Sequence, residues 1–269
     1  MMKEILIDEL KSIELEILQN VHDFCVQNDV NYSICGGTLI GAIRHKGFIP
    51  WDDDIDIIMP RKDYEKFKEL YNSKEDSTYK FIDCYNNKQY FQPFGKVINT
   101  KTKLVETYDR PIDEMGVYID VFPVDGIPRG AVNREKFWQK ITKLKNLNTV
   151  IYAKKIEGEG FLKHSIRTIL FYFFRPFPAN WGAKRISSFA KKVDFNASET
   201  VASSIFGYGR KEEVEKSAFD SYVDLDFEGR KFKSLIGYDT FLKNIYGDYM
   251  QLPSVEKQVA RHEFEAYWR

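Results

Sequence analysis

Four aspartates, Asp52, Asp53, Asp54 and Asp56, stand within five positions and lead into a β-branched run that ends at Pro60. Residues 54–59 are of the types that strands favour, so they predict a strand. Because successive side chains of a strand point to opposite faces, Asp54 and Asp56 should project from one face. Paired carboxylates repel each other and resist burial, so this pattern predicts a bound divalent cation. The alternative is a solvated acidic loop or a helix N-cap.

Magnesium, or manganese in its place, suits such a site. Magnesium prefers carboxylate oxygens and takes its remaining ligands from water and substrate phosphates. A third carboxylate is expected from the apolar run 117–122, which predicts a strand that ends at Pro123 and carries Asp120 in its middle. We expect Asp54, Asp56 and Asp120 to hold one or two ions. A buried salt bridge from Asp120 to a lysine or arginine is the alternative.

A pair of glycines, Gly36 and Gly37, follows a short predicted strand at residues 32–35, and a helix is predicted from Thr38 to Arg44. Glycine allows a ligand to approach the backbone closely, and the N-terminus of a helix offers free N–H groups to a phosphate. We therefore expect Gly36, Gly37 and Thr38 to contact a substrate phosphate. The glycine pair and the acidic strand after it resemble the nucleotidyltransferase fold, the DNA polymerase beta-like architecture.

The remaining patterns predict an α/β (α+β) chain with a mixed sheet. Helical spacing of apolar residues predicts helices at 6–24, 63–72 and 239–246, and strand signals occur at 79–84, 94–98 and 103–107. Residues 222–233 predict a hairpin that turns at Glu228-Gly229. Strand signals vanish from 133 to 194, where helical spacing prevails. We expect one catalytic domain over 1–269, with a core of 1–128 and 200–269 and a helical insertion at 129–199.

Composition narrows the partners. Lysine plus arginine and aspartate plus glutamate number 40 each, and this balance argues against a nucleic-acid partner. The three cysteines are too few and too scattered for a disulfide framework or a zinc site, so buried thiols are expected. The charged N-terminus has neither a signal peptide pattern nor an apolar span. These features predict a protein of the cytoplasm.

The segment GGTLIGAIRHKGFIPWDDDIDIIMPRKDYEKF, which starts at Gly36, resembles the signature of the LicD family. Further similarity lies in FGKVINTKTKLVE, in GVYIDVFPVDGIP and in YGDYMQLP, at 94–106, 116–128 and 246–253. Fukutin and fukutin-related protein share the GG and PWDxDxD core, which keeps Asp52, Asp54 and Asp56 but not necessarily Asp53. The resemblance therefore covers most of the chain outside the helical region.

This resemblance implies a phosphotransferase that uses a CDP-linked donor and a divalent metal and releases CMP. Phosphocholine from CDP-choline is the favoured cargo, and a cell-surface glycan such as a teichoic acid, lipopolysaccharide or capsule precursor is the acceptor. CDP-ribitol or CDP-glycerol is the alternative donor. A nucleotidyltransferase that adds NMP to a small molecule, or a regulatory nucleotide-binding module without activity, would belong to other classes.

Other residues near the motif are candidates for substrate contacts. Arg44 and Lys96 are expected to contact phosphates, and Trp51 and Asp52 flank the acidic run. His262 lies in QVARHEF, which predicts a tail helix that closes over the site. For each basic residue the alternative is an ordinary surface charge, and for Trp51 it is simple packing.

An apolar segment, residues 169–174, is too short to span a bilayer. Arginines flank it, so it could lie in the membrane interface near a lipid-linked glycan acceptor, at the inner face of the cell membrane. The alternative is a buried helix of the insertion.

Overall fold

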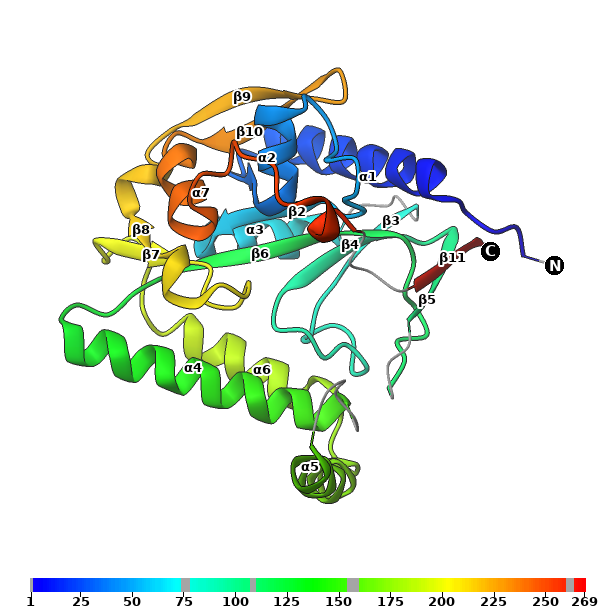
Figure 1. Cartoon of the computed structure of the whole chain (residues 1–269), viewed down its shortest axis with the longest axis vertical. Coiled ribbons are helices and arrows are strands. Elements are labelled where there is room, and N and C mark those ends of the chain that lie inside the picture. Colours follow the sequence, from blue (N-terminus) through cyan, green and yellow to red (C-terminus); the bar gives the residue numbers. More distant parts are fainter. Residues whose placement is uncertain (1, 74–77, 107–109, 154–159, 260–263) are drawn as a thin grey trace.

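The computed structural model describes residues 2–73, 78–106, 110–153, 160–259 and 264–269. Its helices and strands alternate as far as the third helix, and four strands follow (Figure 1). In order, they are α1 (Ile7–Gln27), β1 (Ser33–Ile34), α2 (Gly36–Arg44), β2 (Asp56–Pro60), α3 (Arg61–Tyr71), β3 (Tyr79–Ile82), β4 (Gly95–Asn99), β5 (Thr102–Glu106) and β6 (Tyr118–Gly126).

The second half begins with three helices and ends with short strands. Its elements are α4 (Ala131–Tyr152), α5 (Phe161–Phe174), α6 (Asn180–Ala190), β7 (Thr200–Ala202), η1 (Gly209–Glu212), β8 (Val214–Glu215), η2 (Lys216–Phe219), β9 (Tyr222–Phe227), β10 (Arg230–Leu235), α7 (Tyr238–Tyr246), η3 (Val255–Lys257) and β11 (Phe264–Trp268). The helices α4, α5 and α6 occupy the stretch in which the sequence predicts helices and no strands. None of the described helices is long and apolar enough to cross a membrane.

The central sheet is mixed, with the order β1-β2-β6-β4-β3, and β7 and β8 extend it beside the end of β6. The strands β2 and β6 are parallel, and their register sets Asp56 opposite Asp120. The antiparallel strand β4 sets Lys96 opposite the same Asp120. Three charged side chains from distant parts of the sequence therefore meet in the middle of the sheet.

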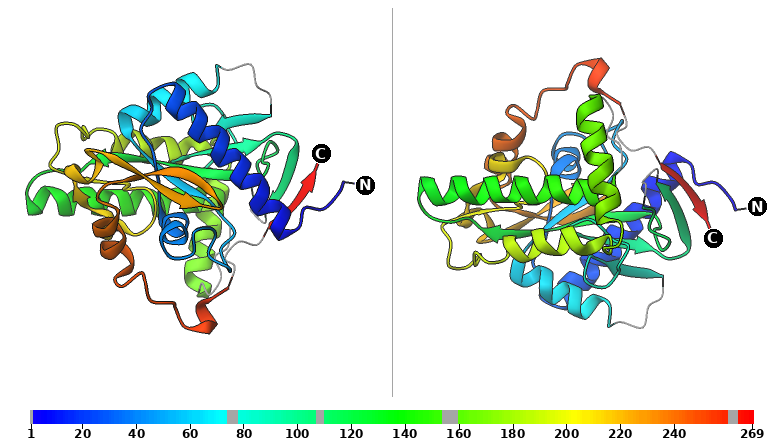
Figure 2. Two further views of the ribbon diagram at one scale, coloured as in Figure 1. Left: turned by 90° about the horizontal axis from the view of Figure 1, so that it is seen from above. Right: turned by 90° about the horizontal axis from the view of Figure 1, so that it is seen from below.

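Apolar faces of the helices close the core. The buried stripe of α1 includes Leu10, Ile13 and Ile17, and α3 contributes Phe67 and Tyr71. In Figure 1, α1 lies above the central sheet and α4 lies below it, and Figure 2 shows the molecule from these two sides. The helices α4 and α6 pack on each other. The mixed sheet together with the helices around it confirms the predicted mixed α/β architecture.

The hairpin β9-β10 turns at the predicted dipeptide, where Glu228 has φ 49° and Gly229 has φ 72°. Both values lie in the left-handed region that two-residue hairpin turns require. The three cysteines are buried and free, as expected. Two further predictions were correct in kind but misplaced at their ends: the strand β2 begins at Asp56, so Asp54 precedes it, and α2 begins at Gly36.

Pro123 does not end its strand, contrary to the prediction, because β6 continues to Gly126. The backbone N–H of Asp120 donates to the backbone oxygen of Ile55, just before β2. Successive residues of a strand direct their backbone groups to opposite sides, so the nitrogen of Pro123 faces away from β2. On that side the pairing with β4 ends at Val121, and the pairing with β7 starts at Asp125. The missing N–H of the proline therefore falls in a gap between partners.

Candidate active site

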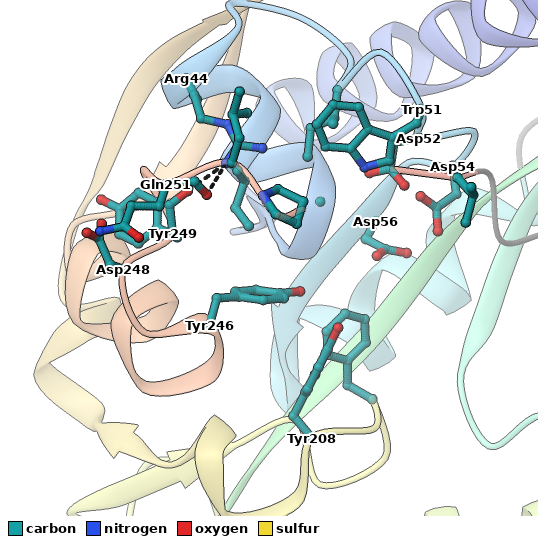
Figure 3. A pocket seen from close by; sticks show the side chains of 17 residues that line it. Arg44, Trp51, Asp52, Asp54, Asp56, Tyr208, Tyr246, Asp248, Tyr249 and Gln251 are labelled. Carbon is teal, nitrogen blue, oxygen red and sulfur yellow. Dashed lines mark hydrogen bonds between the residues drawn. The ribbon is translucent and has the colours of Figure 1, made fainter. Parts of the chain in front are cut away.

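A cavity of about 440 Å³ opens beside the start of β2 (Figure 3). The loop before β2, the helix α2 and the chain from 246 to 259 form its walls. Its lining residues are Gly37, Ile40, Arg44, Ile49, Trp51, Asp52, Asp54, Asp56, Phe206, Tyr208, Tyr246, Asp248, Tyr249, Gln251, Leu252, Pro253 and Val259. Three of the four clustered aspartates thus face one cavity, together with five aromatic rings.

The two glycines that begin α2, Gly36 and Gly37, make room for these carboxylates. A Cβ on Gly36, which has φ 56°, would lie 2.8 Å from Oδ2 of Asp56, and one on Gly37 would lie 2.1 Å from Oδ2 of Asp52. Any side chain at either position would displace an aspartate. Thr38 fixes the start of β2, because its Oγ1 accepts a hydrogen bond of 2.9 Å from the backbone N–H of Asp56.

Asp56 is the buried aspartate among those that line the cavity. It is 7% exposed. Burial, followed by the charges of Asp54, Asp120 and Asp52, raises its pKa well above the usual range for an aspartate, and Lys96 opposes this shift. A divalent cation would offset the same repulsion, and carboxylate oxygens are ligands that magnesium prefers. The donor set at the cavity therefore fits such an ion.

Asp120 has the lysine partner that the sequence left open as the alternative. Its Oδ1 accepts a bond of 2.5 Å from Nζ of Lys96, and that ammonium group lies 3.3 Å from the centre of the Tyr118 ring. Lys96 is buried, so its ammonium group pairs with Asp120 rather than with water. Neither residue lines the cavity described above.

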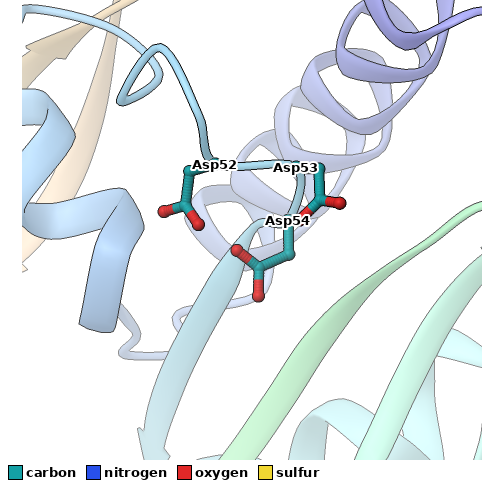
Figure 4. A group of neighbouring side chains, drawn as sticks. All are labelled: Asp52, Asp53 and Asp54. Carbon is teal, nitrogen blue, oxygen red and sulfur yellow. The ribbon is translucent and has the colours of Figure 1, made fainter. Parts of the chain in front are cut away.

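The acidic loop forms a second cluster (Figure 4). Carboxylate oxygens of Asp52, Asp53 and Asp54 lie within 4.8 Å of one another. Among the described residues, Asp52, Asp53 and Asp54 are the three carboxylates that approach one another this closely. The predicted trio of Asp54, Asp56 and Asp120 does not meet this distance. Asp53 is 4% exposed and is not among the cavity residues. Asp54 belongs to both trios.

A buried glutamate that the sequence analysis missed lies next to this loop. Burial, followed by the charges of Asp54 and Asp53, raises the pKa of Glu14 well above its usual range. It lies in α1 among Leu10, Ile13 and Ile17, and an acidic residue within an apolar helical stripe was a signal for it.

Arg44 lies at the cavity but is engaged by the protein. Its guanidinium donates to the backbone oxygens of Tyr249, at 2.8 Å, and Gln251, at 3.1 Å. It therefore ties α2 to the chain that follows α7. Trp51 lines the cavity and meets the His45 ring edge to face, with 6.4 Å between centroids.

The aromatic wall was also missed as part of a site. Phe206, Tyr208 and Tyr246 line the cavity. Figure 3 shows Tyr208 and Tyr246 below Asp56. The loop that carries Tyr208 is fixed by buried Glu212, whose Oε1 accepts from the backbone N–H groups of Gly207, at 3.0 Å, and Tyr208, at 2.7 Å. The motif YGDYMQLP was a usable signal, since Tyr246 and several residues after it line the cavity. No sequence signal marked Phe206 or Glu212.

The last candidate, His262, lies outside the described residues, as do the other residues of 260–263. Of the predicted tail helix, Gln258, Val259 and Phe264 are described. None of the three is helical, and Phe264 begins the strand β11.

Comparison with known proteins adds relatives to this geometry. Residues 29–142 match the family model described as LicD/FKTN/FKRP, nucleotidyltransferase domain. A Haemophilus influenzae protein named lipopolysaccharide cholinephosphotransferase LicD is 31% identical over 269 residues, 99% of each chain. An uncharacterized Rickettsia typhi protein is 38% identical over 65 residues, 24% of this chain and 21% of its own. One from Rickettsia prowazekii is 42% identical over 48 residues, 18% of each chain.

Proposed function

The chain belongs to the LicD family, and on this premise we propose that it transfers phosphocholine from CDP-choline to a hydroxyl of a cell-surface glycan, releasing CMP. The observation that carries the proposal is the similarity over 99% of both chains to a protein named as a lipopolysaccharide cholinephosphotransferase. The glycan is a precursor of lipopolysaccharide, teichoic acid or capsule. The core of the chain is of the nucleotidyltransferase type in this proposal.

The cavity supports a choline cargo over a polyol. Trp51, Phe206, Tyr208, Tyr246 and Tyr249 line it together with the aspartates. Aromatic faces attract a quaternary ammonium through the ring quadrupole, whereas ribitol and glycerol carry no positive charge. Arg44 lies in the same wall, but it is held by backbone oxygens, so the aromatic rings are the better candidates for cargo recognition.

Asp54, Asp56 and Asp120 would hold one or two magnesium ions in this proposal, with Asp52 at the rim. A bound ion would supply positive charge at the pyrophosphate of the donor and stabilise the leaving oxygen of CMP. Around it the protein has to position the reactants. The first turn of α2 has no side-chain cap, so its N–H groups are suited to a donor phosphate.

The transfer exchanges one phosphorus–oxygen bond for another. The acceptor oxygen bonds to the distal phosphorus, the bond from that phosphorus to the bridging oxygen breaks, and CMP leaves. The proton of the acceptor hydroxyl passes to a carboxylate, and we propose Asp120 for this role. Its partner Lys96, 2.5 Å away, would hold that carboxylate in position.

We propose further that the reaction takes place in the cytoplasm, at the inner face of the membrane, where a lipid-linked acceptor is accessible. Separation of cell fractions would test this location, and recovery of the protein outside the cytoplasm would contradict it.

The decisive assay follows CMP release from CDP-choline, CDP-ribitol and CDP-glycerol with magnesium, with and without EDTA. We expect CDP-choline to be the preferred donor and EDTA to stop the release. Preference for a polyol donor would overturn the cargo and keep the mechanism. Incorporation of a nucleotide into product would instead indicate a nucleotidyltransferase.

Tyr208→Leu provides a matched test of cargo recognition. Because the aromatic face is lost, we expect KM for CDP-choline to rise roughly tenfold. Tyr208→Phe, which keeps the ring, should stay close to the parent protein. An equal rise with both variants would assign the role to the hydroxyl and contradict cation–π recognition.

A further inference from the structure

The helix α5 carries apolar side chains on its solvent side. Phe161 is 87% exposed, Ile169 69% and Phe173 67%, and Leu162 and Ile166 are exposed as well. Phe171 is the buried residue of this helix. The alternative that residues 169–174 form a buried helix is therefore wrong, because Ile169, Tyr172 and Phe173 are exposed.

Four of these five residues form one face. With 3.6 residues per turn, Leu162, Ile166, Ile169 and Phe173 point away from the side on which Phe171 packs. The polar side chain among them is Ser165. An ordinary surface helix presents its polar side to water, so this helix has the reverse arrangement.

The stretch of chain that contains this helix is positively charged. Residues 160–193 contain no aspartate or glutamate, although the whole chain balances 40 basic against 40 acidic residues. The basic residues of the stretch are Lys163, Arg167, Arg175, Lys184, Arg185, Lys191 and Lys192. Arg175, Arg185 and Lys191 are exposed. A partner for this surface must be apolar where α5 touches it and negatively charged around that contact.

The position of α5 suits a flat partner. The helix lies at the lower end of the molecule in Figure 1, beyond α4 and α6, and it runs crosswise to α4 in the view from below in Figure 2. Phe177 and Trp181 continue the aromatic surface at its end, with 5.5 Å between ring centroids. Fourteen residues rise by about 21 Å, too little to cross a bilayer, so the helix would lie in the interface plane.

A second copy of the chain fits this surface less well. A two-fold contact would set the basic residues of one copy against those of the other, and like charges across an interface are unfavourable. An anionic bilayer satisfies both requirements at once, because acyl chains accept the apolar face and headgroups attract the lysines and arginines.

We propose that α5 docks the protein on an anionic lipid bilayer, with Leu162, Ile166, Ile169 and Phe173 inserted and the basic residues of the same stretch on the headgroups. This inference does not depend on the donor or on the reaction. It adds a surface on which the protein would meet any lipid-linked acceptor.

Flotation of the full chain with vesicles tests the proposal. The vesicles are phosphatidylglycerol with phosphatidylethanolamine in one arm and phosphatidylcholine alone in the other. We compare the parent protein with Ile169→Glu/Phe173→Glu and with Val26→Glu/Val132→Glu, which alters two exposed valines on other helices by the same charge. Thermal unfolding of each variant establishes that it is folded.

We expect the parent and the valine control to float with the anionic vesicles. The α5 variant should bind these vesicles at least roughly tenfold more weakly. Neutral vesicles should bind all three poorly. Absence of binding by the parent, or equal binding by the α5 variant, would overturn the proposal. Sedimentation equilibrium without lipid adds a second arm, in which a dimer dissolved by the α5 substitutions, together with absent vesicle binding, would assign the face to a second copy.

Discussion

Asp56 concentrates the unfavourable electrostatics of the cavity in one side chain. It is buried, and three other carboxylates raise its pKa. Asp56→Asn removes this repulsion, so we expect a higher melting temperature without metal, together with a loss of turnover of about 100-fold or more. Thermal unfolding with EDTA and with magnesium measures the first effect, and magnesium should stabilise the parent protein far more than the variant. A lower melting temperature in EDTA would contradict the assigned repulsion.

Asp53→Asn separates the two acidic trios. If an ion is held by Asp54, Asp56 and Asp120, this variant should keep its activity and its stabilisation by magnesium. If the ion is held by Asp52, Asp53 and Asp54, which approach one another within 4.8 Å, both should fall steeply. Magnesium titrations followed by thermal shift and by CMP release distinguish the two outcomes.

At this scale, the sequence predicted the residue types better than their partners. The alternation around Asp56 is local, so its place in a strand beside the glycine pair could be predicted from neighbouring residues. The pairing of Asp120 with Lys96 depends on the register between β4 and β6, which no local pattern encodes. Asp54 was assigned to a strand that begins two residues later, because propensity does not fix strand ends.

Among the elements, the loop before η1 depends on Glu212, which is buried and holds the backbone of Gly207 and Tyr208. Glu212→Ala should release this loop, so we expect KM for the donor to rise about tenfold with a smaller change in kcat. Steady-state kinetics with CDP-choline measure the split. Glu212→Gln, which keeps an acceptor oxygen, should recover most of KM. A fall in kcat alone would contradict a positioning role.

The same glutamate predicts a dependence of stability on pH. Burial is the main cause that raises the pKa of Glu212 from 4.5 to about 7, while backbone N–H groups and Lys145 lower it. Because the folded state prefers the protonated form, this contribution is complete below the unfolded pKa and is lost as pH rises through the folded pKa. Urea unfolding at about pH 5 and about pH 8 measures how far the free energy of unfolding falls between the two pH values. This fall should be smaller for Glu212→Gln than for the parent protein. Equal differences would exclude Glu212 as the source.

Element types were largely predictable, because helices and strands here follow clear apolar periods. Their contexts were not. Pro123 was expected to end a strand, and the gap between β4 and β7 is what allows β6 to continue. The direction in which α5 faces was also unpredictable, since the same apolar run suits a buried helix and an interfacial one.

At the scale of the whole molecule, hydrogen bonds join the two ends of the chain. The N–H of Ile5 donates to Ala266, the N–H of Trp268 donates to Lys3, and the indole of Trp268 donates to Glu9 at 2.9 Å. Trp268→Ala removes packing and a hydrogen bond, so we expect the free energy of unfolding to fall by about 2 kcal/mol. Trp268→Phe keeps much of the packing and should lose less. Urea unfolding measures both, and unchanged stability in the alanine variant would contradict a stabilising link between the two ends.

The cavity joins residues 36–56 to residues 206–259, which are the early and late parts of the chain. During synthesis on a ribosome, the glycines and the acidic loop emerge first and remain without the opposite wall until the stretch beyond Tyr246 has followed. A nascent chain therefore has no finished pocket until nearly all of its residues are available. A product of premature termination would retain the aspartates but lack the residues that form the opposite wall of the cavity.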